Sequence, residues 1–211
     1  MKFCLITLKM YLHYIIIIII QMKVGIVMKI YIFVADGSEL CETLMTADLL
    51  LRAGIKTEII TINDDVYTKA SNNIVFLADN TIDHSSYLDA DGIILPGGLP
   101  GTYNLGNNKK IMGIVDHYIS NKKLVAAICA APSILGENGY LKDKKATCYP
   151  GFENKFISGT YTGEKVTVDN NIITAKGLGA CIEFSYEIIK YLLSKRVADE
   201  IMEEIMYYSD K

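Results

Sequence analysis

Short apolar runs alternate with amphipathic segments along this chain. The run 29–35 is rich in β-branched and aromatic residues and leads into the turn sequence Asp-Gly-Ser, as is typical of a buried strand. A helical segment follows, with Ser38 as its expected N-cap and Gly54 just after its end. The run 55–62 is the next expected strand. This β-α-β order predicts a parallel sheet with a right-handed crossover.

The same alternation continues to the end of the chain, without an internal repeat or a second-domain boundary. Further strands are expected at 66–68, 73–77, 92–95, 124–128, 145–148, 165–168 and 171–175, and further helices at 109–120, 180–194 and 197–208. This order predicts one α/β domain, a flavodoxin-like three-layer α/β/α sandwich with a mostly parallel sheet.

Residues 1–27 form a separate apolar segment. Their unbroken apolar run, from Tyr14 to Ile20, is short for a membrane anchor, and no small-residue cleavage site of a signal peptide follows it. A third interpretation is that translation starts at Met28 or Met22. We favour this third interpretation, and we expect the folded domain to occupy residues 28–211 without stable membrane association.

Charge narrows the classes of partner. The chain has 21 Lys and Arg against 24 Asp and Glu, and residues 1–27 contain three of the lysines but no acidic residue. The rest of the chain therefore has 18 basic against 24 acidic residues, a formal charge of −6. This acidic balance argues against a nucleic-acid partner and against binding to an anionic membrane.

The cysteines indicate a reducing compartment. They are Cys4, Cys41, Cys129, Cys148 and Cys181, an odd number with no C-x-x-C spacing. Unclustered cysteines of this kind fit the cytoplasm better than a disulfide framework. With only three histidines in addition, the sequence gives no support for a zinc site, and we expect no metal.

The segment 124–132 has the most distinctive pattern. A short apolar strand leads into Cys129, and small residues then open a helix. A sharp turn between strand and helix lifts one side chain above the sheet edge, as the nucleophile elbow of hydrolases does with serine. The nearby helix N-terminus would favour the thiolate form of Cys129. An ordinary buried cysteine at the end of a strand is the alternative.

Two other strand ends carry unusual residues, at 36–42 and 96–98. Because parallel strands place their carboxyl ends at one edge of the sheet, we expect both segments to lie beside Cys129. Gly97 and Gly98 lack a Cβ and can bring their backbone N–H groups close to a developing oxyanion. The N–H group of Ala130, directly after the cysteine, is a further candidate donor.

Glu42 is the candidate acid or base. If Glu42 turns toward Cys129, the two acidic groups cannot comfortably both ionise, and a carboxyl with a raised pKa that donates to the thiolate is one solution. The N-terminus of the helix works in the opposite direction, because it stabilises a carboxylate. The balance between these effects depends on burial. Glu39 is expected to face solvent.

No histidine adjoins the cysteine. His84 lies in a polar loop and His117 on a helix, and we expect both at the surface. The pairing of base and nucleophile found in cysteine proteases and glutamine amidotransferases is therefore not visible.

Five segments taken together resemble the ThiJ/PfpI superfamily and, within it, the DJ-one branch, which includes the parkinsonism-associated protein deglycase and the bacterial YajL-like proteins. They are ADGSELCET at 35–43, RAGIK at 52–56, LPGG at 95–98, AAICAAP at 126–132 and KGLG at 176–179. They follow the family's order over residues 28 to about 200.

The resemblance implies roles for particular residues. Cys129 corresponds to an oxidation-sensitive nucleophile, and Glu42 corresponds to a protonated glutamate that hydrogen-bonds it. The oxyanion-binding backbone corresponds to Gly97, Gly98 and Ala130, and we expect Tyr149 and Gly179 to line the pocket. The resemblance also implies a homodimer and no cofactor.

Two positions depart from the animal members that the chain resembles. Tyr149 stands where they have a pocket histidine, and Asn72 stands about where they have an arginine contributed across the dimer. The family's protease branch has a histidine directly after the cysteine, so Ala130 argues against peptide hydrolysis.

Three functions remain open at this stage. The first is a cytoplasmic, cofactor-independent cysteine enzyme in oxidative or carbonyl stress defence. It would act on reactive α-oxoaldehydes such as methylglyoxal, or on glycated proteins, as glyoxalase III and protein deglycases do. The second is a redox-sensing stress chaperone in which Cys129 is oxidised to sulfinic acid. The third is a non-catalytic α/β domain in which Cys129 is merely packed.

Overall fold

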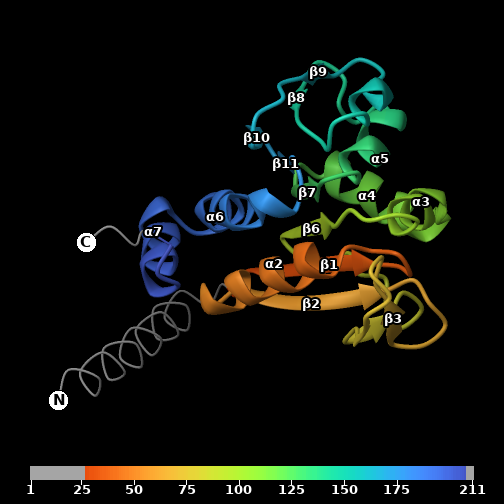
Figure 1. Ribbon diagram of the computed structural model, residues 1–211, viewed down its shortest axis with the longest axis horizontal. Helices are drawn as coiled ribbons and strands as arrows, with labels where there is room; N and C mark the ends of the chain where they lie inside the picture. The colour runs from red at the N-terminus through yellow and green to blue at the C-terminus, as the bar shows by residue number, and fades with distance from the viewer. Residues whose placement is uncertain (1–26, 208–211) are drawn as a thin grey trace.

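The computed structural model describes residues 27–207, so our expectations for residues 1–26 lie outside it. Within that range a seven-stranded sheet has the order β10-β11-β7-β6-β1-β2-β5 (Figure 1). Its strands are β1 (Lys29–Val34), β2 (Lys56–Thr61), β5 (Asn80–Thr81), β6 (Gly92–Leu95), β7 (Leu124–Ile128), β10 (Val166–Asp169) and β11 (Ile172–Ala175). All neighbours pair parallel except β10 and β11, so the predicted mostly parallel sheet is confirmed.

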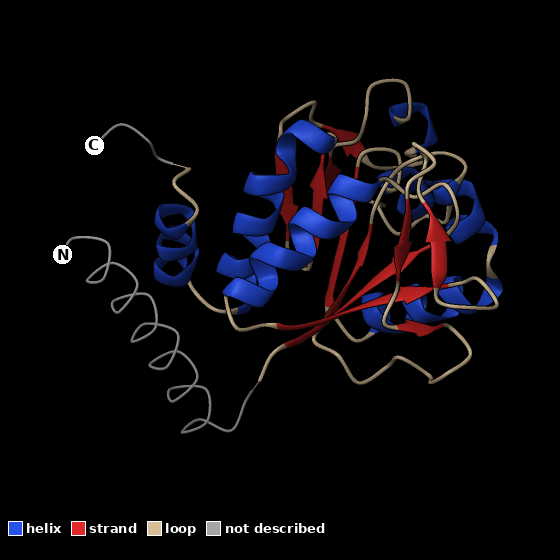
Figure 2. Ribbon diagram, turned by 60° about the horizontal axis from the view of Figure 1, so that its bottom comes forward, coloured by secondary structure: helices blue, strands red, loops and turns tan. Residues whose placement is uncertain are grey.

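Helices cover both faces of this sheet and complete the predicted three layers (Figure 2). One face packs against α2 (Leu40–Arg52), α6 (Cys181–Leu192) and α7 (Lys195–Glu204). The other face packs against α3 (Gly101–Asn107), α4 (Lys109–Ser120) and α5 (Pro132–Glu137). None of the helices described for residues 27–207 is long and apolar enough to cross a membrane.

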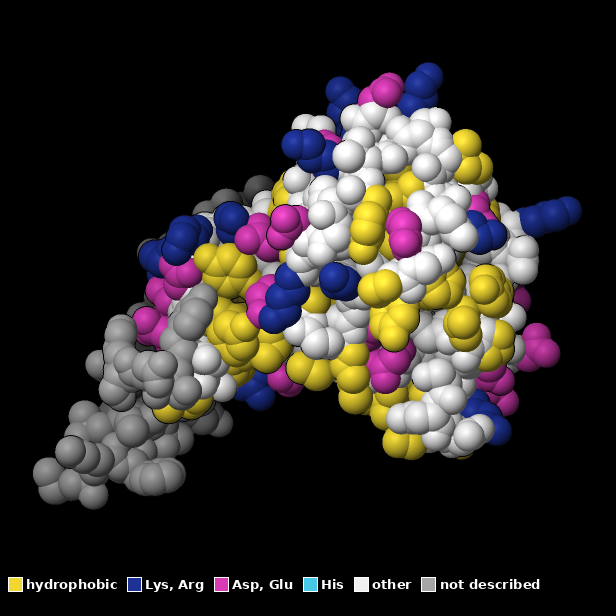
Figure 3. Space-filling model, turned by 45° about the horizontal axis from the view of Figure 1, so that its top comes forward, with side chains coloured by type: hydrophobic (Ala, Val, Ile, Leu, Met, Phe, Trp, Pro, Cys, Tyr) yellow, Lys and Arg dark blue, Asp and Glu magenta, His cyan; other side chains and the backbone are white. Residues whose placement is uncertain are grey.

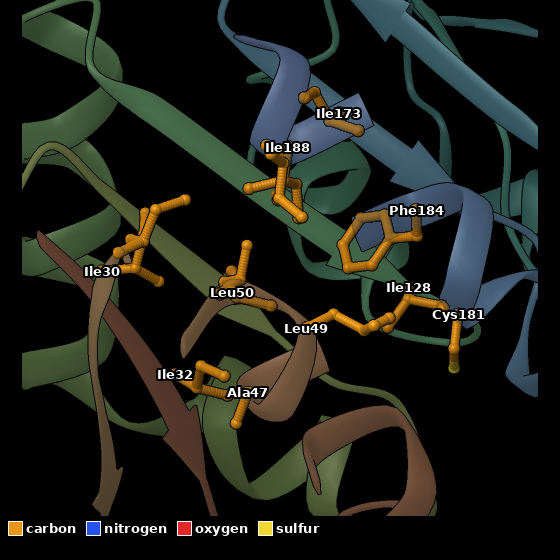
Figure 4. Packing of buried hydrophobic residues seen from close by; sticks show 14 of the residues in the cluster. Ile30, Ile32, Ala47, Leu49, Leu50, Ile128, Ile173, Cys181, Phe184 and Ile188 are labelled. Atoms are coloured by element: carbon orange, nitrogen blue, oxygen red, sulfur yellow. The ribbon is translucent and has the colours of Figure 1, made fainter. Parts of the chain in front are cut away.

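Alternation along the strands explains the two cores. In β1, Ile30 and Ile32 belong to the cluster under α2 and α6, whereas Tyr31 and Phe33 belong to the cluster under α4. Successive side chains of a strand point to opposite faces, and both faces are covered here, so β1 is apolar throughout after Lys29. Figure 4 shows how Leu50 of α2 and its neighbours fill the first cluster.

Smaller elements lie outside the main sheet. They are the hairpin β3 (Tyr67–Lys69) with β4 (Val75–Leu77), the pair β8 (Lys145–Ala146) with β9 (Thr160–Tyr161), and the 3₁₀ turns η1 (Glu153–Lys155) and η2 (Leu178–Ala180). The edge strand β5 was not predicted, because two residues carry no measurable alternation.

On the face seen in Figure 3, basic and acidic side chains are interspersed.

The start of α2 differs from its prediction. Glu39, not Ser38, is the N-cap, and its carboxylate accepts the N–H of Glu42 at 2.7 Å. The Ser38 hydroxyl oxygen is buried and instead accepts the N–H of Ala35 at 3.0 Å, which closes the turn after β1. The expected glycine at the other end is confirmed, since Gly54 has φ of +77° directly after the helix.

Candidate active site

Cys129 follows β7 directly and has a φ of +63°. This left-handed conformation costs a residue with a Cβ about 1–2 kcal/mol. Hydrogen bonds hold it on both sides, because the Cys129 N–H donates to the Ala175 carbonyl at 2.9 Å and the Cys129 carbonyl accepts the N–H of Tyr149 at 2.7 Å. The sulfur-bearing residue is therefore fixed at the carboxyl edge of the sheet, and its side chain is half-buried.

Glu42 comes to the same edge from the first turn of α2. Its side chain is buried, and Oε2 accepts the N–H of Gly97 at 2.8 Å. Oε1 is also buried and has no nitrogen or oxygen partner among the described residues. The Cys129 thiol is close enough to this carboxyl for the two groups to shift each other's pKa. A buried oxygen with so few donors favours the neutral acid over the carboxylate.

The pKa of Glu42 reflects this environment. Burial raises the pKa to about 7, against the opposing hydrogen bonds from Gly97 and Cys129, and the nearby charge of Glu39 raises it further. Burial therefore outweighs the hydrogen bonds that favour the carboxylate. The carboxyl gains and loses a proton near neutral pH, as a general acid or base requires.

The thiol of Cys129 titrates in the opposite sense to our expectation. Burial, the charge of Glu42 and the hydrogen bond to Glu42 raise the thiol pKa to about 12, whereas the N–H groups of Ala130 and Gly98 lower it. The α5 helix begins only at Pro132 and has six residues, so its N-terminus contributes little. Above neutral pH, Cys129 and Glu42 together hold one proton. The proton that leaves near neutral pH is therefore lost by the pair and not by the sulfur alone.

The glycine pair has divided roles. The Gly97 N–H, which we expected as an oxyanion donor, is occupied by Glu42. A Cβ on Gly97 would lie 2.6 Å from the Cβ of Cys129 and 2.9 Å from Oε2 of Glu42, so only glycine allows this approach. The N–H groups directed at the sulfur belong to Gly98 and Ala130. They are the two candidate donors for an oxyanion on a group bound to Cys129.

The predicted pocket residues Tyr149 and Gly179 lie in different surroundings. The Tyr149 N–H donates a hydrogen bond to the Cys129 carbonyl, and the residue is 52% exposed. Gly179 is exposed, and no heavy atom lies within 4 Å of the place where its Cβ would be. Sequence reasoning missed Gly177, although it lies in the quoted KGLG segment. A Cβ there would lie 3.8 Å from Sγ of Cys129.

Cys129 differs from the other cysteines described. Cys148 and Cys181 are buried, and burial raises the pKa of each thiol to about 12 without any backbone donor acting on the sulfur. Cys41 is half-buried in the first turn of α2. Only Cys129 combines partial exposure with a buried carboxyl and two backbone N–H groups, within residues 27–207.

A family model described as the DJ-1/PfpI family matches residues 28–191. The chain belongs to this family. The relationship suggested by the five sequence segments is thereby confirmed, and its DJ-1 branch is confirmed by relatives that are themselves DJ-1 proteins.

Relatives within the DJ-1/PfpI family agree over most of the chain. Protein dj-1beta of Drosophila melanogaster is 31% identical over 83% of this chain and 95% of its own length. Protein DJ-1 homolog B of Arabidopsis thaliana is 36% identical over 82% of this chain, which spans only 40% of that longer protein. For homolog A, also 36% identical, the share is 44%.

Solved structures support the fold. The crystal structure of Drosophila melanogaster DJ-1beta has a TM-score of 0.82 at 30% identity, and the match covers 86% of this chain and 98% of the other. An oxidized DJ-1 from Toxoplasma gondii also has a TM-score of 0.82 at 30% identity, with 85% and 98% covered. The predicted flavodoxin-like fold is therefore confirmed.

The remaining candidate residues of this DJ-1/PfpI member differ in exposure. His84 is exposed, His117 is half-buried on α4, and Asn72 is exposed in the β3–β4 turn, where its side chain accepts the N–H of Ile74. Glu39, expected to face solvent, is half-buried because it caps α2. Residues 27–207 contain no group of three or more His, Cys, Asp and Glu that could hold a metal ion.

Proposed function

We propose that this chain is a cofactor-independent cysteine enzyme that converts small α-oxoaldehydes to 2-hydroxy acids, in defence against oxidative or carbonyl stress. The observation that carries the proposal is the Cys129–Glu42 pair. A partly exposed sulfur lies within reach of a buried carboxyl whose pKa of about 7 suits proton transfer at neutral pH. Membership of the DJ-1/PfpI family supports a stress-related function.

The chemistry begins with addition of sulfur to the aldehyde. Ionised Glu42 takes the proton from the Cys129 thiol as a carbon–sulfur bond forms and the carbonyl π bond opens. The resulting oxyanion accepts hydrogen bonds from the N–H groups of Gly98 and Ala130. Glu42 then returns its proton to this oxygen, which gives a hemithioacetal. Because the sulfur never has to ionise alone, its raised pKa is compatible with attack.

An internal redox step follows, with no external oxidant or reductant. Glu42 removes the proton from the former aldehyde carbon, giving an enediolate, and returns it to the neighbouring carbon, while the hydroxyl proton on the first carbon passes to the oxygen of the second. The first carbon is thereby oxidised to a thioester and the second is reduced to an alcohol. One water then hydrolyses the thioester, which releases the hydroxy acid and restores the thiol. The sum is one α-oxoaldehyde plus one water giving one 2-hydroxy acid.

Lactate formation from methylglyoxal tests this proposal. Cys129→Ala is expected to abolish turnover, and Glu42→Gln is expected to lower kcat by about 10²–10⁴-fold, the usual contribution of a general acid or base. Cys41→Ala removes a thiol that lies outside the pair and is the matched control. Full lactate production by Cys129→Ala would contradict the proposal, and so would an unaltered kcat in Glu42→Gln.

A redox-sensing stress chaperone is the second candidate. The sulfur is partly exposed beside a proton-sharing carboxyl, and the Toxoplasma gondii DJ-1 structure is described as oxidized. One molecule of hydrogen peroxide would convert the thiol to sulfenic acid and water, and a second would convert the sulfenic acid to sulfinic acid and water. Intact-mass measurement after mild peroxide should show two added oxygen atoms in wild type and none in Cys129→Ala. Oxygen spread equally over all cysteines would count against sensing.

Assembly and location form the last part of the proposal. We infer a homodimer in the cytoplasm, on the family relationship and on the unclustered cysteines. Light scattering of the purified chain should give twice the mass of one chain, and a monomer at micromolar concentration would overturn this part alone.

A further inference from the structure

The Tyr149 ring borders the space next to the Cys129 sulfur. A methyl group placed on Gly177 would lie 3.8 Å from Sγ of Cys129 and 3.4 Å from Cδ2 of Tyr149. The missing Cβ of Gly177 therefore leaves a gap of about methyl size between the sulfur and the Tyr149 ring. A small group attached to the carbon that bonds the sulfur would occupy this gap and contact the ring.

Tyr149 is placed firmly but stays open to a ligand. Its N–H donates to the Cys129 carbonyl at 2.7 Å, and its own carbonyl accepts the N–H of Phe152 at 3.1 Å. The side chain is nevertheless 52% exposed, and its hydroxyl makes no hydrogen bond within residues 27–207. Main-chain hydrogen bonds fix the backbone of Tyr149, while its ring remains accessible to a ligand.

Within residues 27–207, the charged side chains that act on the Cys129–Glu42 pair are acidic. Glu42 lies against the sulfur, and the charge of Glu39 acts on Glu42 from the N-cap of the same helix. Lys176, which precedes Gly177 in the chain, directs its Nζ to the carbonyl of Gly163 at 3.3 Å. A substrate that carries its own negative charge would therefore enter a region of negative potential.

We infer that the site selects uncharged α-oxoaldehydes whose substituent lies against the Tyr149 ring, and discriminates against those with a carboxylate or phosphate. Tyr149 is then a specificity-determining residue. The inference rests on the proposed function, because it concerns the substrate of the same Cys129 site. It adds which members of the substrate class the site accepts.

The charge part is tested with two substrates of one carbon skeleton. The anion 4,5-dioxopentanoate and its neutral methyl ester are compared at pH 8 in wild type, and kcat/KM for the ester should be larger by about tenfold. Equal values would overturn the selectivity while leaving the proposed function intact. If neither the ester nor methylglyoxal is turned over, the proposed function itself has failed.

The ring part is tested by substitution at position 149. Tyr149→Leu should raise KM for phenylglyoxal about fivefold through loss of the aromatic contact, with a smaller effect on KM for methylglyoxal. Tyr149→Lys should narrow or reverse the preference for the ester over the anion. Tyr191→Leu, at an exposed position far along α6, is the control for loss of a tyrosine. Unchanged KM ratios in both Tyr149 variants would overturn this role.

Discussion

Along β7, the residues from Leu124 to Ile128 are fully buried and paired with strands on both sides, whereas Cys129, the next residue, is half-buried with a positive φ. The strand contributes burial of apolar surface, which stabilises the fold without any special geometry. The residue after it brings costs, namely a left-handed backbone, a buried carboxyl neighbour and a thiol that resists ionisation.

The two regions contribute to the free energy of unfolding with opposite sign: the buried strand stabilises the fold, whereas the site at its end destabilises it. Both faces of the sheet are sealed by apolar clusters, so the interior can support an unfavourable arrangement at its edge. The Glu42 carboxyl would ionise more readily in water, and the backbone of Cys129 would have a lower energy at a negative φ. Each is held in place because neighbouring elements leave it no alternative. Substitutions in the two regions should therefore have different signatures.

The largest expected effect belongs to the interior. Phe184 on α6 is completely buried among residues of β7, β11 and α2 (Figure 4). Phe184→Ala should lower the free energy of unfolding by about 3–5 kcal/mol, measured by urea denaturation. Tyr191→Ala on the same helix, at a position 44% exposed, should change it by less than about 1 kcal/mol. Equal losses would break the distinction between core and edge.

The next effect concerns the buried carboxyl and has the opposite sign. The pKa of Glu42 is about 7 in the folded chain against an ordinary value of 4.5. Between these pH values the folded state holds a proton that the unfolded state has lost, so stability falls as pH rises from 4.5 to 7, by about 3 kcal/mol at most. Glu42→Gln should remove this loss.

Urea denaturation at pH 5, 6, 7 and 8 measures the difference between the two proteins. The stability of Glu42→Gln relative to wild type should rise from pH 5 to pH 7 and level off toward pH 8. Glu203→Gln, at an exposed position on α7, should follow wild type throughout. Parallel curves for wild type and Glu42→Gln would mean that Glu42 is ionised in the folded state at all these pH values.

The smallest expected effect tests whether Cys129 and Glu42 titrate as a coupled pair. The alkylation rate of Cys129 by iodoacetamide should rise with pH in both wild type and Glu42→Gln up to about pH 7. Above that pH the wild-type rate should level off, because the ionised carboxyl raises the thiol pKa, while the variant rate continues to rise. At pH 9 the variant should react about tenfold faster. Superimposable profiles would show that the two groups titrate independently.

The fold could be read from the sequence because its signals are local and repeated. Apolar runs such as 29–35 and 124–128 mark strands buried on both faces, and the glycine at 54 marks the end of α2. The errors lie at short elements and caps. The two-residue strand β5 has no period to detect, and the N-cap of α2 is Glu39 although Ser38 is the residue type preferred there.

The site could be read only in part. The juxtaposition of Cys129, Glu42 and the glycine pair follows from the rule that parallel strands bring their ends together. Protonation could not be read, because burial decides the pKa of Glu42 and burial depends on the whole fold. The use of the Gly97 N–H by Glu42 and the place of Gly177 above the sulfur were also invisible, since both are contacts between segments distant in the chain.

The hydrogen bond from the Tyr149 N–H to the Cys129 carbonyl has a consequence for how such a site can diversify. Because the bond is made by the main chain, any residue except proline can make it. The side chain at 149 can therefore be exchanged without moving the nucleophile. Directed evolution of this chain toward new aldehydes should find its first gains at this position, and libraries that keep Cys129 and Glu42 while varying residue 149 are the shortest route to them.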